Sequence, residues 1–485
     1  MKIKSNWLIH LVLIGLVVFS LLATFSIFSS STWIHNLINP LVGNQSRPLA
    51  QIAGSDNQED LQLAKTFGVR KVIRHQENGQ YGQSIDTKLT QLMNDYLIQL
   101  GKQKLEVTKS PLADNYYEKF SGQAYAILAF ADEIPLSFFI SQTPDSDFSG
   151  QERVSQVIIT AEDNQVYLLN EKAQEMIIVS SSDQKESISK LAKNLADYPF
   201  TPVIPVNLDG RYLFLTNQDV RLDRLTYMIE RQANVNYLSQ LFAAPSEVHD
   251  YSDEIYTRYY GDEGKLMINT QTYSLLFERH GDLVEPTDYE ATLVNSLAQL
   301  SKFQHNIDNW YFTSYDEANH QVRYRYFVNN IPIFGQDYTA KAELVMSAND
   351  LQALRMSTIN IQTPLTDRSK SLVLPSGQEV YQGLVAAGID QNDIQDMVPG
   401  YYWIYSQESA RLVELVPTWF IRLGGNWQLL SNLVDLNQQK NLATKDQEGQ
   451  VFDFNRHINP QGQDSQDSNS FQALDEDMTI NGFEN

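Results

Sequence analysis

Residues that could do chemistry are sparse in this chain, and their spacing favours neither a metal centre nor a catalytic one. The eight histidines are scattered, and no two stand four residues apart, the spacing at which one helix face can hold a metal ion. His249-Asp250 and His280-Gly281-Asp282 place an imidazole near a carboxylate, as metal ligands and acid–base pairs do. Exposed or capping residues in loops are the favoured interpretation of both.

A calcium site and the common catalytic motifs are also poorly supported. Asp145 to Gly150 resembles the first half of a calcium-binding loop, but Gln156 stands where that loop needs a bidentate Glu. The sequence lacks G-x-S-x-G, H-E-x-x-H, a P-loop and G-x-G-x-x-G. It contains no cysteine, which excludes disulfides, thiolate metal sites and cysteine nucleophiles. We therefore expect no catalytic residues, no metal and no cofactor, and interpret the chain as a non-enzyme.

Two other patterns concern binding rather than catalysis. In Val322 to Phe327, Arg323 and Arg325 alternate with apolar and aromatic residues, which indicates a strand with one core face and one largely positive face. An ordinary half-buried strand with solvated arginines is the favoured interpretation, and a surface for an acidic partner is the alternative. The aromatic runs Tyr401–Trp403 and Pro417–Phe420 are interpreted as sheet core rather than as a ligand platform.

The element that must position the rest of the chain is an apolar run near its start, Leu8 to Phe28. It has no Asp, Glu, Lys or Arg and is long enough for an α-helix to cross the hydrocarbon core of a bilayer. Lys2 and Lys4 precede it, and the next basic residue is Arg47, so the positive-inside rule places the N-terminus in the cytoplasm and the body outside. A cleaved signal peptide is the alternative, but the run is longer than a typical signal core. We expect an uncleaved single-pass anchor in the cell membrane.

Composition limits the partners of the exported body. The 485 residues carry a formal net charge of −23, which argues against nucleic acid and anionic lipid as partners because both are polyanions. The 42 % hydrophobic and 11 % aromatic content is enough for packed cores. An exported protein of this size without disulfides is typical of a Gram-positive cell surface.

Hydrophobic periodicity predicts an α+β fold, with one N-terminal transmembrane helix and a multi-domain extracytoplasmic body of mainly antiparallel sheets with packed helices. Helices are predicted at Thr87–Leu100, Ser187–Asp197, Asp219–Phe242 and Asp288–Leu300. Strands are predicted at Ala124–Phe130, Val154–Thr160, Val166–Leu169, Met176–Val179, Arg211–Thr216, Lys265–Ile268, Thr272–Glu278, Trp310–Ser314, Val322–Val328 and Ile331–Phe334. Asn329-Asn330 predicts a two-residue hairpin turn, and Pro332 predicts that the strand after it lies at a sheet edge.

Shifts in composition divide the chain into six regions. The prolines between Tyr198 and Pro205 mark the first boundary within the body, and the chain becomes polar and acidic beyond Lys440. We predict a cytoplasmic start and transmembrane helix at 1–32, a linker at 33–60, an N-terminal extracellular α+β domain at 61–205, a middle domain at 206–287, a C-terminal α+β domain at 288–440 and an acidic disordered tail at 441–485.

Several short segments resemble a known family when taken in order. They are Arg211–Leu215, Tyr237–Glu247, Val322–Gly335, Leu374–Gly377 and Leu415–Trp427. With the N-terminal helix, this order resembles the YycH (WalH) family, regulatory proteins of the WalK/YycG two-component sensor kinase in low-GC Gram-positive bacteria. The hairpin departs from the family in having Asn330-Ile331 where Gly is usual, and the long acidic tail is not typical.

The resemblance implies a non-enzymatic accessory protein that modulates a sensor histidine kinase controlling cell-wall metabolism. Its implied partners are a WalK/YycG-like kinase and a YycI-like protein, contacted through the transmembrane helix and the extracellular domains, and the domain at 288–440 is then YycI-like. Small residues let membrane helices approach closely, so Gly15, Ser20, Ala23 and Ser26 are the candidate helix–helix contacts. The alternatives are a helix that only anchors, an exported envelope ligand-binding module, and a wall-active enzyme, for which no motif is present.

Overall fold

The computed structural model describes residues 58–451, except for 114–115, 121, 141–151, 161–164, 181–194, 209–210, 305, 349, 366–369, 435–441 and 447–449. The apolar run Leu8–Phe28, with the candidate contacts Gly15, Ser20, Ala23 and Ser26, lies outside these residues, as does the calcium-like segment Asp145–Gly150. Of the helices in the described part of the chain, none has the length and apolarity needed to cross a membrane. The anchor therefore stays a prediction.

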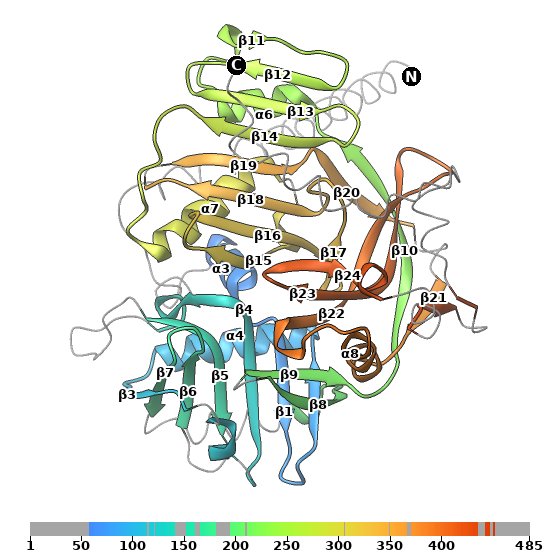
Figure 1. The fold of residues 1–485 in the computed structure, drawn as a ribbon. Coiled ribbons are helices and arrows are strands. Elements are labelled where there is room, and N and C mark those ends of the chain that lie inside the picture. The colour runs from blue at the N-terminus through green and yellow to red at the C-terminus, as the bar shows by residue number, and fades with distance from the viewer. Residues whose placement is uncertain are drawn as a thin grey trace, which may run out of the picture.

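The first half of the body forms a nine-stranded antiparallel sheet, at the bottom of Figure 1, in the order β3-β7-β6-β5-β4-β1-β2-β8-β9. The strands are β1 (Lys71–His75), β2 (Tyr81–Ser84), β3 (Glu106–Pro111), β4 (Tyr125–Pro135), β5 (Arg153–Thr160), β6 (Gln165–Asn170), β7 (Glu175–Ser180), β8 (Thr201–Leu208) and β9 (Arg211–Thr216). Helix α4 (Thr87–Gly101), capped by the Asp86 carboxylate, buries Leu89, Met93 and Leu97 against one face. The short helix η2 (Tyr116–Phe120) covers the other face with aromatic side chains.

The second half forms a sixteen-stranded sheet that fills the rest of Figure 1. Its main path is β11-β12-β13-β14-β19-β18-β16-β17-β22-β23-β10-β21-β25, and β15, β20 and β24 pair at its sides. The strands are β10 (Val220–Arg231), β11 (His249–Asp250), β12 (Tyr256–Tyr260), β13 (Gly264–Asn269), β14 (Ser274–Arg279), β15 (Trp310–Asp316), β16 (Gln321–Val328), β17 (Ile331–Phe334), β18 (Lys341–Met346), β19 (Leu351–Ser357), β20 (Ile359–Pro364), β21 (Lys370–Leu374), β22 (Ile394–Tyr405), β23 (Leu412–Leu423), β24 (Asn426–Leu429) and β25 (Lys445–Asp446). The remaining α-helices are α3 (Gln58–Phe67), at the start of the described chain, α6 (Asn234–Leu241), α7 (Tyr289–Phe303), α8 (Gly377–Ala386) and α9 (Leu430–Leu433). The remaining short helices are η3 (Leu136–Phe138), η4 (Pro245–Glu247), η5 (Ile307–Asn309) and η7 (Gln391–Asp393).

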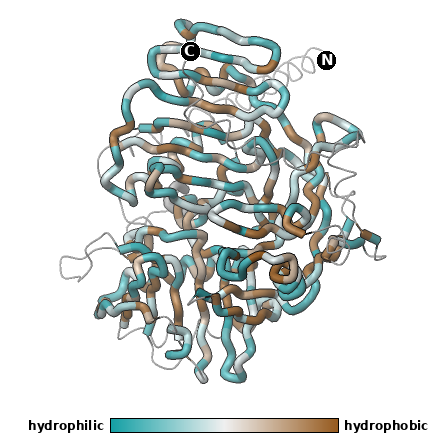
Figure 2. The backbone as a smooth tube through the Cα atoms, in the orientation of Figure 1, coloured by the Kyte–Doolittle hydropathy of each residue, from teal (hydrophilic) through white to brown (hydrophobic). Residues whose placement is uncertain are grey.

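The predicted class of mainly antiparallel sheets with packed helices is confirmed, and apolar residues recur along the strands of both sheets (Figure 2). Every predicted strand is present, the predicted hairpin of β13 and β14 is formed, and two of the predicted helices are α4 and α7. The predicted helix at Ser187–Asp197 lies mostly outside the described residues. Asn329 and Asn330 form the two-residue turn with φ of 50° and 62°, because Asn tolerates positive φ.

Two local predictions were wrong. Asp219–Phe242 is not one helix but strand β10 followed by α6. The apolar spacing in this segment fits both periods, and pairing with β21, β20 and β23 selects the strand. Pro332 does not lie at an edge, because β17 stands between β16 and β22. Pro332 is tolerated there for two reasons. It faces Phe327, next to the Val328–Ile331 pair that closes the turn, and antiparallel strands exchange no hydrogen bond at that position. On the other side, β22 begins to pair with β17 only at Ile333.

The predicted domain boundaries at 205/206 and 287/288 remain predictions, and neither coincides with an edge of a sheet. Pro205 pairs with Phe214 inside the β8–β9 ladder, and β14 pairs with β19 across the second boundary. The predicted tail, 441–485, lies mostly outside the described residues, but its beginning is packed. Thr444 is buried and donates to the carbonyl of Pro417 at 3.2 Å, and Lys445–Asp446 pairs with β21.

A continuous core joins the two sheets. Helix α3 lies between them in Figure 1, and its Phe67 is in ring contact with Phe138 from the first half and with Phe312 and Tyr324 from the second, with centroids 5.3 to 6.2 Å apart. Phe67 is only 2 % exposed. Burial of a large side chain contributes about 1.5–3 kcal/mol, so this one ring is a substantial part of the attachment between the halves.

Beside this core, Arg70 locks the turn of the β16–β17 hairpin to the first sheet. Its guanidinium lies 3.7 Å from the centroid of the Tyr311 ring and 4.4 Å from that of Phe327, and it donates to the side-chain oxygen of Asn330. The Asn330 amide nitrogen donates in turn to the carbonyl of Ile85. Burial lowers the pKa of Arg70 to about 10, so the group stays charged, and the two ring faces replace part of its lost hydration.

A second contact between the halves places buried carboxyl groups at the seam. Ser137 donates to the Glu290 carboxylate at the start of α7, and Tyr289 donates to the backbone carbonyl of Glu133 at 2.6 Å. Burial raises the pKa of Glu290 and of Glu133 above the ordinary value of 4.5, and the Ser137 hydroxyl and the Lys172 ammonium only partly offset this. These carboxylates therefore cost stability when they are ionised.

We expect Asn330→Gly to lower the free energy of unfolding of the full-length protein by about 1–3 kcal/mol, because it leaves buried donors and acceptors on Arg70 and Ile85 unpaired. Asn329→Gly is the matched control. Its φ is also positive, but its side chain is exposed, so a change within about 0.5 kcal/mol is expected. Urea unfolding of both variants in detergent tests this. Equal losses would show that Asn330 acts only through the turn.

We expect Glu290→Gln to stabilise the protein near neutral pH and to lose that advantage in acid. The pKa of Glu290 is higher in the folded protein than in the unfolded chain. At low pH, where the carboxyl is protonated in both, it does not affect the free energy of unfolding, and it lowers this free energy increasingly as pH rises from 4.5 through the raised pKa. Thermal unfolding midpoints at about pH 4 and about pH 7.5 measure the difference. The exposed Glu77→Gln is the control. A variant less stable than wild type at neutral pH would contradict the desolvation argument.

Candidate functional site

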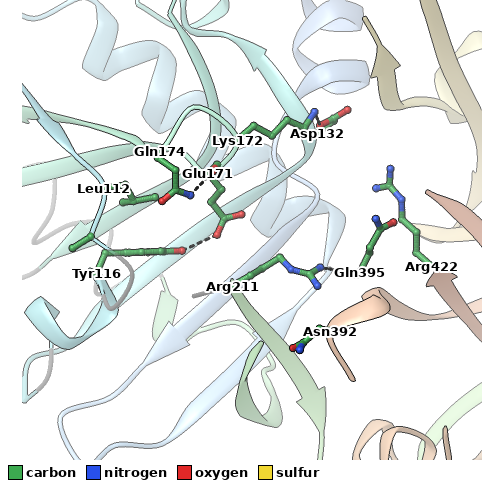
Figure 3. Close-up of a pocket in the computed structure, with 11 residues that line it drawn as sticks. Leu112, Tyr116, Asp132, Glu171, Lys172, Gln174, Arg211, Asn392, Gln395 and Arg422 are labelled. Carbon is green, nitrogen blue, oxygen red and sulfur yellow. Dashed lines mark hydrogen bonds and ion pairs between the residues drawn. The ribbon is translucent and has the colours of Figure 1, made fainter. Parts of the chain in front are cut away.

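A pocket of about 530 Å³ opens where the first sheet meets the second. The wall from the first sheet carries Tyr116, Asp132, Glu171, Lys172, Gln174 and Arg211, with Leu112 and Ala113 as apolar lining. The opposite wall carries Asn392, Gln395 and Arg422. Figure 3 shows these side chains converging from the two halves of the chain, with Glu171 and Tyr116 on one side and Arg422 and Gln395 on the other. Volumes of this size are typical of sites for small molecules.

The first wall holds carboxylates in fixed positions. Glu171 follows β6 in the short turn to β7 and accepts a hydrogen bond from the Tyr116 hydroxyl at 2.8 Å. Burial raises the pKa of Glu171, and the Tyr116 hydroxyl and the Arg211 charge partly reverse this shift. Asp132 accepts from Lys172 at 2.7 Å and from the Tyr315 backbone at 3.1 Å, so its oxygens are used within the fold.

The cations of the pocket differ in whether other groups of the protein pair with them. Arg211, at the start of β9, donates to the carbonyls of Ile394 at 2.7 Å and of Gln395, and so ties the first sheet to β22. Arg422, near the end of β23, makes no hydrogen bond or ion pair with any residue in the described part of the chain, and its Nε is buried without a partner. Asp396 lies opposite it across the strands, but the Asp396 carboxylate accepts from the Met397 backbone at 2.8 Å.

This arrangement offers binding groups of both signs. Over the residues that the structure describes, no three His, Asp or Glu side chains gather as metal ligands would. A carboxylate held by a tyrosine on one wall faces a guanidinium with unused donors on the other (Figure 3). Such a pocket can hold a small charged molecule by ion pairs and hydrogen bonds.

The residues singled out from the sequence lie elsewhere. The candidate helix contacts are outside the described residues. His249-Asp250 is exposed, as predicted, but it forms the outer strand β11 rather than a loop. His280 is exposed in the turn just after β14, with its Nδ1 3.3 Å from the carbonyl of Asp262, as the loop interpretation predicted.

The positive face expected on β16 is a correction. Arg323 pairs with Asp316 at 3.3 Å and Glu343 at 3.4 Å, and Arg325 is buried over the Phe334 ring. The half-buried strand is confirmed, with Val322, Tyr324 and Tyr326 in the core, but its two arginines are paired or buried rather than solvated. The aromatic runs at 401–403 and 417–420 are core as predicted.

No sequence pattern predicted the pocket. Its charged residues lie in a turn, near strand ends and within β4, where charges are common, and the two walls meet only because the sheets are joined at the seam. The doublet Glu171-Lys172 after a buried strand, followed much later by Arg422 before a glycine pair, is the remaining signal, and it is weak.

Comparison with known proteins is consistent with the fold and the motif order. The family model of the YycH protein, C-terminal domain, matches residues 210–439. The crystal structure of YycH from Bacillus subtilis superimposes with a TM-score of 0.58 at 16 % sequence identity, and the match covers 76 % of this chain and 96 % of that chain. No curated protein sequence matches. Residues 210–439 therefore belong to the family of YycH C-terminal domains.

Proposed function

We propose that this protein is a membrane-anchored accessory protein that modulates a sensor histidine kinase controlling cell-wall metabolism. The observation that carries the proposal is the match of the YycH C-terminal domain over residues 210–439, which spans nearly all of the sixteen-stranded sheet. That family is a regulatory one, and its YycI and kinase partners are the ones we propose here. The proposal places the large body outside the membrane and the short N-terminus in the cytoplasm.

The composition of the body supports a scaffold for protein contacts. The net charge of −23 of the whole chain keeps the body soluble beside an anionic envelope and makes it unsuited to polyanionic partners. Strands before and after 287 share one sheet, and buried aromatic residues join that sheet to the first. A body joined in this way can hold an anchor and an extracellular contact surface in a fixed relation.

The proposed contact inside the membrane works through differential packing. Small residues at Gly15, Ser20, Ala23 and Ser26 fall on one broad side of a helix with 3.6 residues per turn. A helix that packs better against one state of the kinase shifts the kinase toward that state by the difference in affinity. A difference of about 1–2 kcal/mol changes the ratio of the two states roughly 5- to 30-fold.

A second function, an exported module that binds an envelope ligand, is favoured by one observation. The pocket between the sheets contains a guanidinium that is left without a partner in the described part of the chain. The two functions are compatible, because a ligand on the body and a kinase contact in the membrane use different parts of the chain.

We expect replacement of Gly15, Ser20, Ala23 and Ser26 by Leu to abolish co-purification of the full-length protein with the kinase and to change output of the kinase's target genes roughly 5- to 30-fold. The matched control places Leu at Ile14, Val17, Phe25 and Phe28 on the opposite side of the helix, and it should leave both readouts unchanged. Membrane insertion of both variants is checked by fractionation. Unchanged pairing and output in the first variant would leave the helix as an anchor only.

A further inference from the structure

We propose that the pocket between the two sheets binds a small zwitterion, an amino acid or short peptide, whose carboxylate meets Arg422 and whose ammonium group meets Glu171. This inference goes beyond the regulatory function, and it does not depend on any contact with a kinase. Its basis is the geometry of the two walls.

The Arg422 wall is built to receive an anion. Arg422 lies in β23, a strand hydrogen-bonded on both sides by β22 and β24, so its backbone is fixed. Its Nε is buried without a partner, and a buried donor left unpaired is costly. A carboxylate satisfies a guanidinium with two parallel hydrogen bonds, which makes it the fitting partner for this group. Gln395 and Asn392 stand on the same wall as further hydrogen-bonding side chains (Figure 3).

Arg211 strengthens the positive end of the pocket without being available as the main ligand. Two of its nitrogens donate to backbone carbonyls at the start of β22, and its charge remains in the pocket. The five charged lining residues are three cations and two carboxylates, in a protein whose overall charge is −23. Cations therefore outnumber carboxylates in the lining of the pocket, although the whole molecule is strongly negative.

The Glu171 wall fits the other end of the ligand. The Tyr116 hydroxyl fixes the carboxylate, and Figure 3 shows its oxygens directed toward the open part of the pocket, away from Lys172. Lys172 is engaged by Asp132, so the Glu171 carboxylate is the acceptor left for an ammonium group. Leu112 and Ala113 supply an apolar lining beside Tyr116, suited to a short aliphatic side chain.

The size of the pocket limits the ligand. A volume of about 530 Å³ holds an amino acid or a dipeptide, and Glu171 and Arg422 stand on opposite walls. A molecule that has only one of the two charges leaves one wall unsatisfied. We therefore expect the free dipeptide to bind more tightly than its singly charged derivatives.

The test is isothermal titration of the full-length protein in detergent with alanine, alanyl-alanine, N-acetyl-alanyl-alanine, alanyl-alanine amide and inorganic phosphate. We expect alanyl-alanine or alanine to bind with a Kd of about 1 mM or tighter, and each blocked derivative to bind at least about tenfold more weakly. Binding of phosphate alone would reveal a simple anion site and overturn the proposal. No binding of either zwitterion up to about 10 mM would overturn it as well.

Two variants assign the ends of the ligand. Arg422→Gln should weaken the binding of alanyl-alanine at least about tenfold and remove the preference for the free carboxylate over the amide. Glu171→Gln should remove the preference for the free amine over the acetylated one. Arg221→Gln, an exposed arginine on β10 outside the pocket, is the control and should bind as wild type. If both pocket variants keep both preferences while they remain folded by thermal unfolding, the site lies elsewhere and the assignment is wrong.

Discussion

Arg70 carries a positive charge into the seam between the two sheets, where its guanidinium packs against the rings of both Tyr311 and Phe327. Its hydrogen bond to Asn330 reaches a turn of the second sheet, and Asn330 returns a bond to the first sheet at Ile85. A buried charge is tolerated only where its lost hydration is replaced, so this contact has little freedom to slide. Because the seam fixes how the sheets meet, it also fixes the distance between the walls of the pocket.

Some charged groups along the seam have hydrogen-bond or ion-pair partners within the protein, and one does not. This difference distinguishes groups that hold the fold together from a group that is suited to a ligand. Arg211 and Lys172 are matched by carbonyls or a carboxylate, and each match joins segments that are distant in sequence. Arg422 has no such match in the described part of the chain. A half-buried guanidinium that lines a pocket, has an unpaired Nε and joins no other segment is suited to a ligand, which is the physical ground for assigning it to binding.

Local rules were enough to predict much of the fold. Strands such as β5 and β16 follow from alternating burial, and the Asn329-Asn330 turn follows from the tolerance of Asn for positive φ. Segment 219–242 failed because its apolar residues fit two periods, and only the pairing partners of β10 decide between them. The pocket was not predicted from the sequence for a related reason. Glu171 and Arg422 look like ordinary charges at strand ends until the seam brings their strands together, and no local pattern encodes that meeting.

The position of the pocket makes a bound ligand sensitive to how the two sheets meet. One wall belongs to the matched C-terminal domain, and the other is mostly the sheet that precedes it. A ligand that pairs with both walls favours the relative placement of the sheets in which both pairs form, and by linkage a partner that favours the same placement tightens the ligand. Helix α3 is the described segment nearest the N-terminus, and its Phe67 is packed between both halves at the seam. The described segment that comes first after the predicted membrane helix is therefore in direct contact with the seam.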